Sequence, residues 1–183
     1  MPNHKLTQEH LSQCLEYNKD TGTLTWKQRP RSHFFSAGRF KAWNSVYPGR
    51  EAGHTSKNYR YFRLDGKRHP THRVIFLIMT GKLPNLMVDH KNGTGTDNRW
   101  DNLREATPTI NQQNCAMMAS NTSGKTGVHW HKRSNRWRAR IQLSGRDKYI
   151  GQFINFQDAC DARELAERLY GFSERHGKSR SDV

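Results

Sequence analysis

The sequence predicts an α+β fold built from two small units, each with its own sheet and helix. Residues 86–114 read as strand, loop, strand and helix, and residues 127–170 read as three short strands followed by a helix. Of the 183 residues, 33% are hydrophobic, which is low for one large core and suits two small ones better. We therefore expect a ββα module followed by a three-stranded antiparallel sheet packed on one helix.

Residues 1–70 are expected to form a helix, strands and basic loops that support the first unit. Thr7 can cap a short helix, and residues 23–26 read as a strand. A hairpin is expected over residues 56–68, because Asp65-Gly66 is a strong signal for a two-residue turn.

A buried helix is expected at the start of a core that spans residues 71–116. Residues 72–80 form the most apolar stretch of the chain, and Gly81 is typical of a helix end. His72 has two open interpretations. It is either a core histidine with satisfied hydrogen bonds, or a residue that contacts the site or a phosphate.

The residues with the clearest chemical potential follow that helix. Leu86 to Val88 read as a short buried strand that leads into Asp89 and His90. Residues 93–98 are polar and rich in glycine, which indicates a loop, and residues 103–107 read as the returning strand.

A second helix is predicted directly after the returning strand. Thr107 can cap this helix, and Pro108 suits its first position. Asn111 and Asn114 then lie three residues apart, on one face of the helix.

Asp89 and His90 place a carboxylate beside an imidazole. The carboxylate can bind a hard cation through oxygen, and the imidazole titrates near neutrality, so it can take a proton from water. A lone Asp-His pair is usually a surface dipeptide, and a lone asparagine is usually a turn or cap residue. The asparagines spaced downstream, Asn102 and Asn111, are what favour a catalytic site.

This set of residues resembles the HNH nuclease family with its ββα-metal site, and in particular the phage branch that includes homing endonucleases. The motifs that carry the resemblance are Asp89-His90, Asp97-Asn98-Arg99, Asn102-Leu103-Arg104 and Asn111-x-x-Asn114. The resemblance implies that His90 is the general base and that Asn102 orients its ring. It also implies that Asp89 and Asn111 hold one divalent cation, Mg²⁺ or Mn²⁺. Many members of the family have histidine where Asn111 stands. His72 and Asn114 are further candidates for supporting contacts.

The C-terminal part has a different composition. Residues 117–125 read as a linker, residues 126–177 as a second domain, and residues 178–183 as a disordered tail. Three short strands lead into a helix that Asn155 can cap and Gly171 can end.

The second domain resembles the AP2 DNA-binding domain. The resemblance is carried by Gly127-Val128, Arg136-Trp137 with Ala139 and Ile141, Tyr149 to Phe153, and Asp158-Ala159. Tyr149 stands where plant members usually have tryptophan, and the first strand has histidines instead of arginines. Plant site specificity is therefore not transferred.

Strand alternation predicts one apolar and one basic face on the second strand of this domain. Trp137, Ala139 and Ile141 share one face, while three arginines share the other. Such a face is either solvated or in contact with DNA, and the lysine and arginine side chains around it favour contact with DNA. The predicted DNA-binding residues are Lys125, Trp130, Arg133, Arg136, Arg138, Arg140, Lys148 and Tyr149.

The charge balance is consistent with this expectation. Lysine and arginine number 31 against 16 acidic residues, a net charge of +15, which indicates a polyanionic partner such as double-stranded DNA. A merely basic or ribosomal protein is the alternative. Residues 27–50 have no regular pattern and read either as a loop that lies along DNA or as a flexible surface loop.

The three cysteines are far apart and form no Cys-x-x-Cys motif, so a zinc ribbon is not expected. Reduced thiols and the lack of an apolar signal region suggest a cytoplasmic protein of a bacterial or phage-infected cell. The longest apolar run, residues 74–79, is too short to span a membrane.

The predicted function is that of a metal-dependent HNH endonuclease that nicks or cuts duplex DNA at a preferred site. One motif per chain is consistent with a monomer or weak dimer. The alternative is a catalytically inactive DNA-binding regulator, and a third interpretation is a protein that binds structured RNA.

Overall fold

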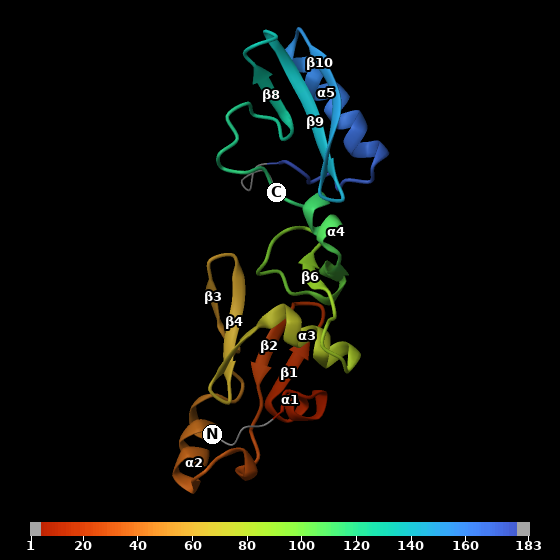
Figure 1. Cartoon of the computed structure of the whole chain (residues 1–183). Helices are drawn as coiled ribbons and strands as arrows, with labels where there is room; N and C mark the ends of the chain where they lie inside the picture. Colours follow the sequence, from red (N-terminus) through yellow and green to blue (C-terminus); the bar gives the residue numbers. More distant parts are fainter. Residues whose placement is uncertain (1–4, 179–183) are drawn as a thin grey trace. The chain divides into compact units, whose positions relative to one another are not determined.

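The computed structural model describes residues 5–178, so the predicted tail at 178–183 lies outside the described residues except for Lys178. The chain divides into two compact units, 1–105 and 106–183, which we describe separately (Figure 1). The fold is mixed α+β with four small sheets among the described residues. The division falls inside the stretch 71–116 that the sequence predicts as one core. None of the described helices is long and apolar enough to cross a membrane.

The first unit begins with helix α1 (Gln8–Cys14) and an antiparallel hairpin of β1 (Leu15–Asn18) and β2 (Thr23–Trp26). The Thr7 side chain accepts a hydrogen bond from the backbone nitrogen of His10, so the predicted cap is confirmed.

Residues 27–50 contain regular structure that the sequence did not reveal. A 3₁₀ turn, η1 (Arg31–His33), precedes α2 (Ala37–Val46), which the Ser36 side chain caps. No residue of α2 is buried. Its inner face is formed by the half-buried rings of Phe40 and Trp43, which pack on Phe34, so its apolar stripe is short and weak as a pattern from which to predict a helix.

A three-stranded antiparallel sheet follows, formed by β3 (His54–Ser56), β4 (Tyr59–Leu64) and β5 (Lys67–Pro70). Asp65 and Gly66 both have positive φ, at 51° and 82°, which confirms the predicted turn. Helix α3 (Thr71–Thr80) ends at Gly81, which has a left-handed conformation, again as predicted.

The core of the first unit lies where α1, α3 and the sheets meet. Its most deeply buried side chains are Leu11, Leu24, Phe62, Val74 and Ile75. These are contributed by four different elements, so the unit is held together by tertiary packing rather than by any one helix.

The last elements of this unit are β6 (Met87–His90), η2 (Trp100–Asn102) and β7 (Leu103–Ala106), in which β6 and β7 pair. The prediction that the apolar residues entering this strand are buried was wrong. Leu86 and Met87 are each 43% exposed, whereas Asp89 and His90 are buried. The strand thus turns its polar end inward.

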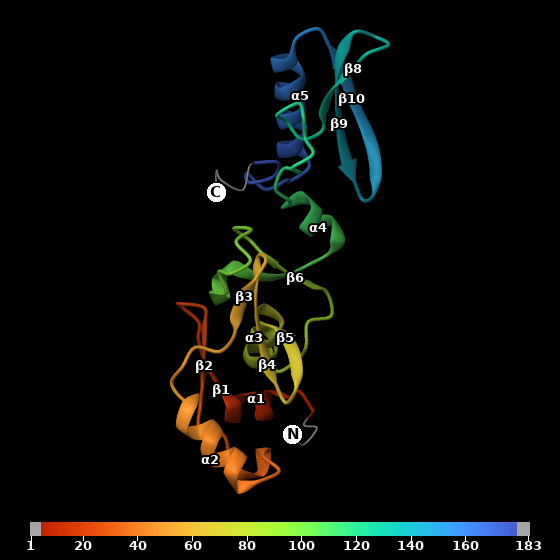
Figure 2. The ribbon, with the colours of Figure 1, turned by 90° about the vertical axis from the view of Figure 1, so that its left-hand side faces the viewer.

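The second unit contains α4 (Pro108–Gln113), β8 (Val128–His131), β9 (Arg136–Leu143), β10 (Arg146–Phe153) and α5 (Phe156–Leu169). The sheet order is β10-β9-β8, and α5 packs on one face (Figure 2). The core contains Val128, Ala139, Ala159 and Cys160. Leu169, predicted to lie on the apolar face of the helix, is 73% exposed because α5 ends there.

One buried arginine organises the second unit. Arg163 is 2% exposed and donates to the carbonyl oxygens of Thr126 and Arg140 at 3.1 and 3.0 Å, while it pairs with Glu167 at 3.0 Å. Gly127 is needed beside it, because a Cβ there would lie 2.5 Å from the Arg140 carbonyl oxygen. These contacts join α5 to the sheet.

The segment 117–125 is more ordered than its linker-like composition suggests. The Ser123 hydroxyl donates to the carbonyl oxygen of Val128 at 2.6 Å, and the backbone nitrogen of Met117 donates to the carbonyl oxygen of Lys178 at 3.0 Å. Both contacts attach the segment to the second unit.

Candidate active site

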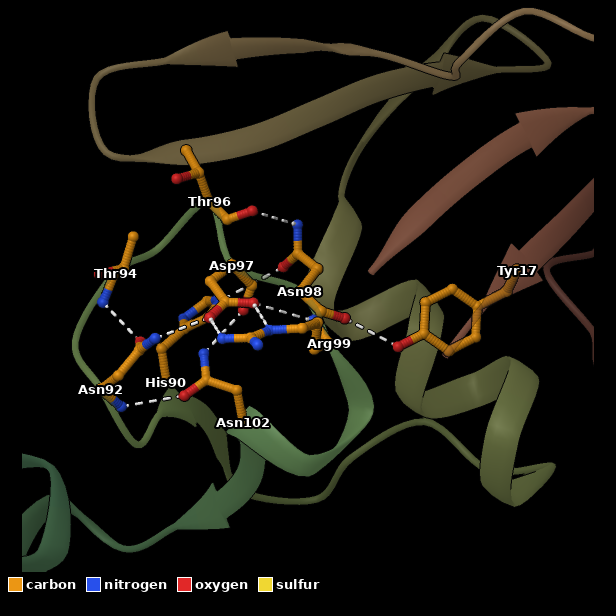
Figure 3. Close-up of polar contacts among 9 residues, drawn as sticks. All are labelled: Tyr17, His90, Asn92, Thr94, Thr96, Asp97, Asn98, Arg99 and Asn102. Carbon is orange, nitrogen blue, oxygen red and sulfur yellow. Dashed lines mark hydrogen bonds and ion pairs between the residues drawn. The ribbon is translucent and has the colours of Figure 1, made fainter. Parts of the chain in front are cut away.

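A closed loop between β6 and β7 builds the candidate site (Figure 3). Asn102 holds the two ends of the loop together. Its side-chain oxygen accepts a hydrogen bond from the backbone nitrogen of Asn92 at 2.9 Å, and its amide donates to the carbonyl oxygen of Asp97 at 2.7 Å. The side chain at position 102 therefore spans a ten-residue loop.

Asp97 is the second fixed point of the loop. Its carboxylate accepts hydrogen bonds from the Asn92 amide at 2.7 Å and from the Arg99 guanidinium at 2.8 and 2.6 Å. The hydrogen bond from Arg99 is the main reason why the pKa of Asp97 falls to about 2. The carboxylate is therefore charged, and the loop closed, throughout the neutral range.

Asp97→Asn is expected to destabilise the first unit by about 1–2 kcal/mol near neutral pH, because a charged hydrogen-bond acceptor is lost from a partly solvated site. The lowered pKa of Asp97 determines the direction in which this contribution to stability changes with pH. The stability it contributes is present above its ordinary pKa of 3.8 and disappears as the pH falls through about 2. Urea unfolding at several pH values should show a constant difference from wild type at neutral pH that shrinks only in strong acid. A difference that grew on acidification would contradict this assignment.

The loop is anchored to other parts of the first unit. The Tyr17 hydroxyl donates to the carbonyl oxygen of Asn98 at 2.7 Å, and the backbone nitrogen of Trp100 donates to the carbonyl oxygen of Lys19 at 3.0 Å. Gly95 packs against the turn between β3 and β4, where a Cβ would lie only 2.1 Å from the Asn58 carbonyl oxygen. The loop is thus positioned by two separate hairpins.

His90 lies at the end of β6 and is 3% exposed. Its Nε2 is 3.1 Å from the side-chain oxygen of Asn98. Because an amide oxygen only accepts hydrogen bonds, Nε2 carries the proton of the neutral ring. Nδ1 is then the nitrogen that can take up a proton.

This contact bears on one sequence-based expectation. Asn102 was expected to orient the His90 ring. Nε2 of the ring donates to the side-chain oxygen of Asn98, while the amide of Asn102 binds the loop backbone. An action of Asn102 on the ring, through the loop that carries Asn98, stays a prediction. Asn98 is 1% exposed. Its only sequence signal was its place in the Asp97-Asn98-Arg99 motif.

His90 and His72 form an uncharged pair of rings. Burial lowers the pKa of His90, and the neighbouring Asn98, Asp89 and Asp97 partly oppose that effect. Burial, with the charges of His90 and Arg73, lowers the pKa of His72 to about 4. The ring centroids are 5.3 Å apart. Within residues 5–178, Nδ1 of His72 is buried without a hydrogen-bond partner. A neutral His72 beside His90 fits a supporting contact better than a phosphate contact.

Asp89 is buried next to His90 and pairs with Arg104. Nε and Nη2 of Arg104 both donate to Oδ2 of Asp89, at 3.0 and 2.8 Å. Sequence reasoning cited Arg104 within a motif but gave it no role. Its contact stabilises the charged form of the carboxylate in a buried position.

The two asparagines of the α4 region have different positions. Asn111 lies in α4 of the second unit, so its pairing with Asp89 as a metal ligand stays a prediction. Asn114 ends α4 and is buried, and its side-chain oxygen accepts a hydrogen bond from the Ser173 hydroxyl at 2.9 Å. It therefore supports the C-terminal segment of its own unit. The predicted cap at Thr107 and the proline at the helix start are confirmed.

The predicted DNA-binding residues fall into two groups. Trp130 and Tyr149 are 41% and 56% exposed, and Arg133, Arg136 and Lys148 are also exposed, whereas Arg138 and Arg140 are half-buried. Lys125 differs, because it pairs with Glu164 at 2.9 Å and Glu167 at 3.7 Å on α5. It has a structural role in the described unit.

The predicted alternation on β9 is confirmed, because Ala139 and Ile141 are buried and Trp137 packs on Phe156 of α5. On the other face, Arg138 stands opposite His129 of β8, and Arg140 stands opposite Tyr149 of β10. The side of the sheet away from its helix therefore carries basic side chains and Tyr149, whereas Trp130 stands opposite Trp137 and shares the helix-side face.

The loop, its buried histidine and the carboxylate beside it lie in the part of the chain for which a family is known. A profile of the HNH endonuclease family matches residues 69–113, which include β6, the loop and β7. The chain belongs to this family, and its membership supports a nuclease.

A relative of this chain is Protein 3.8 of Escherichia phage T7. The two are 32% identical over 91 residues, which cover 49% of this chain and 73% of the phage protein. No solved structure matches the chain.

Proposed function

We propose that this protein is a metal-dependent endonuclease that hydrolyses a phosphodiester bond of duplex DNA, with His90 as the general base. The observation that carries the proposal is the fixed ring of His90. Asn98 holds Nε2 in its protonated form, and the anchored loop keeps that contact in place. The ring can then take a proton at Nδ1 from an attacking water.

The lowered pKa of His90 supports this role, because a base must be uncharged to accept a proton. The neighbouring Asp89 acts to raise the pKa of His90, so it favours the imidazolium that forms. Arg104 holds the carboxylate in place through Oδ2.

We propose Asp89 and Asn111 as the residues that would hold one divalent cation. Their donors are a carboxylate and an amide oxygen, and hard cations such as Mg²⁺ and Mn²⁺ prefer oxygen ligands. When bound, such an ion supplies electrostatic stabilisation of the negative charge that develops at the phosphate.

The experiment that tests the proposal is the nicking of supercoiled plasmid by the full chain with Mg²⁺ or Mn²⁺. We expect conversion to the open circular form, and its loss when EDTA removes the ion. Cleavage that continues in EDTA would contradict the metal requirement. Binding without cleavage in any divalent ion would favour a DNA-binding regulator.

We further propose that the basic face of the β8–β9–β10 sheet binds the target, as the resemblance to AP2 domains implies. Arginine side chains on a sheet can reach guanine edges and phosphates in the major groove. Tyr149 adds an exposed ring to this face, while Trp130, which packs on Trp137 at the helix-side face, would contact DNA only at the edge of the sheet. Double-stranded DNA is the proposed partner, and one site per chain is expected to give a nick.

Replacing Arg138 and Arg140 together by alanine is expected to weaken binding to duplex DNA by at least about 30-fold, because two contacts with bases, each contributing roughly 1–3 kcal/mol, sum to about 2 kcal/mol or more. Nicking on saturating DNA should change much less. Gel-shift titrations at fixed salt measure the first effect, and single-turnover nicking measures the second.

The matched control is Arg168→Ala, which removes one positive charge from an exposed position of α5, on the other face of the sheet. It should bind DNA almost as wild type does. Unchanged binding with lost turnover in the double variant would show that the sheet does not recognise the target.

A further inference from the structure

A buried cluster of side chains of metal-binding types lies in the N-terminal part of the first unit, well before the loop between β6 and β7 in the sequence. His10 and Cys14 are four residues apart, on one face of α1, and His33 comes from the η1 turn. All three are buried, with exposed fractions of 8%, 0% and 3%. The segment between them contains a hairpin, so the cluster joins parts of the chain that are not adjacent.

The donor atoms have the spacing that a tetrahedral metal needs. Sγ of Cys14 is 3.8 Å from Nε2 of His10 and 3.6 Å from Nδ1 of His33, and the three ligand atoms lie within 4.8 Å of one another. In a tetrahedral zinc site with Zn–S of about 2.3 Å and Zn–N of about 2.0–2.1 Å, sulfur and nitrogen lie roughly 3.6 Å apart. The cluster could accept such an ion with its backbone in place.

The fourth ligand would be the Asp65 carboxylate on the turn between β4 and β5, which lies outside the group of three donors and would shift toward a bound ion. Oδ2 of Asp65 lies 2.7 Å from Nε2 of His10, and Oδ1 accepts a hydrogen bond from Nη2 of Arg29 at 2.6 Å. Metal coordination through Oδ2 would leave Arg29 as the partner of the other oxygen, an arrangement that orients carboxylate ligands in metal sites. The weaker contact of Arg29 Nε with His33 Nδ1, at 3.3 Å, would be replaced by the metal bond.

The composition of the cluster favours a transition metal over a hard cation. Two imidazoles and a thiol are ligands for zinc, whereas Mg²⁺ and Mn²⁺ prefer oxygen.

We propose that His10, Cys14, His33 and Asp65 form a structural site for one zinc-class ion in the first unit. The ion would join α1, the η1 turn and the β4–β5 turn, three segments that share the core behind the nuclease loop. The site is separate from the proposed cation at Asp89 in both ligands and position in the sequence. It does not depend on the proposed nuclease function.

The test is the metal content of the untagged full-length protein, expressed with added zinc and then dialysed against a buffer that contains Mg²⁺ but no zinc or other transition metal. We expect about one zinc ion per chain. Replacement of zinc by Co²⁺ should give thiolate-to-cobalt charge transfer and the visible bands of tetrahedral cobalt. Removal of the ion should lower the midpoint of thermal unfolding by at least about 5 °C.

Matched variants locate the site. Cys14→Ser should lose the zinc and the thiolate–cobalt band, while Cys160→Ser, which changes a buried free cysteine of the second unit, should keep both. Asp89→Ala should also keep them, which separates this site from the proposed catalytic ion. If Cys14→Ser does not fold, the cobalt spectrum and the zinc content of the wild-type protein still test the proposed site. Zinc-free wild type without a thiolate–cobalt band, or a band that survives in Cys14→Ser, would overturn the proposal.

Discussion

His90→Ala is expected to reduce plasmid nicking by about 10²–10⁴-fold, which is the range that a positioned general base contributes. The ring is buried, its Nε2 is held by Asn98, and its lowered pKa keeps it uncharged near neutral pH. Alanine removes the proton acceptor and leaves the loop contacts of Asn102 in place. Single-turnover nicking with Mg²⁺ or Mn²⁺ measures the loss.

A control for this experiment is His129→Ala, which removes an exposed histidine from β8 in the second unit. It should leave the rate on saturating DNA close to wild type. Gel-shift binding of His90→Ala should also be near wild type, because the proposed DNA-binding sheet is unchanged. Nicking by His90→Ala at the wild-type rate would remove the base assignment and would favour another residue of the loop.

The elements that the sequence predicted well depend on local chemistry. Thr107 and Pro108 start α4, Gly81 ends α3, and Asp65-Gly66 forms the turn of a hairpin. In each case one or two residues carry the required cap or conformation, so neighbours distant in sequence add little.

The contacts that the sequence did not reveal depend on tertiary structure. Asn98 reaches the ring of His90 because Tyr17, which lies 81 residues earlier, fixes the carbonyl oxygen of Asn98. Arg104 reaches Asp89 because β6 and β7 pair. Pattern and spacing could identify the motif residues, but they could not say which asparagine contacts the ring.

The dispersed cluster in the first unit illustrates the same limit. Its candidate ligands are contributed by α1, η1 and a turn, at positions 10, 14, 33 and 65. No local spacing motif connects them, and the lack of a Cys-x-x-Cys pair pointed away from zinc. Only the folded unit brings their donor atoms together.

The division of roles between the two loop asparagines predicts opposite responses to the same substitution. Asn98→Ala should reduce nicking by about 10²-fold, because the ring loses the acceptor that fixes its orientation and tautomer. Asn98→Asp keeps an oxygen acceptor for Nε2 and should restore most of the rate. At position 102, aspartate should fail to do so. The Asn102 amide donates to the carbonyl oxygen of Asp97, and a carboxylate would place two acceptors 2.7 Å apart.

Nicking rates and urea unfolding of Asn98→Ala, Asn98→Asp, Asn102→Ala and Asn102→Asp together test this assignment. Asn98 positions the ring, so its alanine variant should lose rate, and aspartate should rescue that rate even though both variants lose the long contact of the amide, 3.4 Å, with the carbonyl oxygen of Thr96. Asn102 closes the loop, so both of its variants should lose stability as well as rate, because a buried backbone acceptor loses its donor. Rescue by aspartate at 102 and not at 98 would reverse the assignment and place the ring contact on Asn102, since only the residue that accepts from the imidazole can exchange an amide for a carboxylate without losing its function.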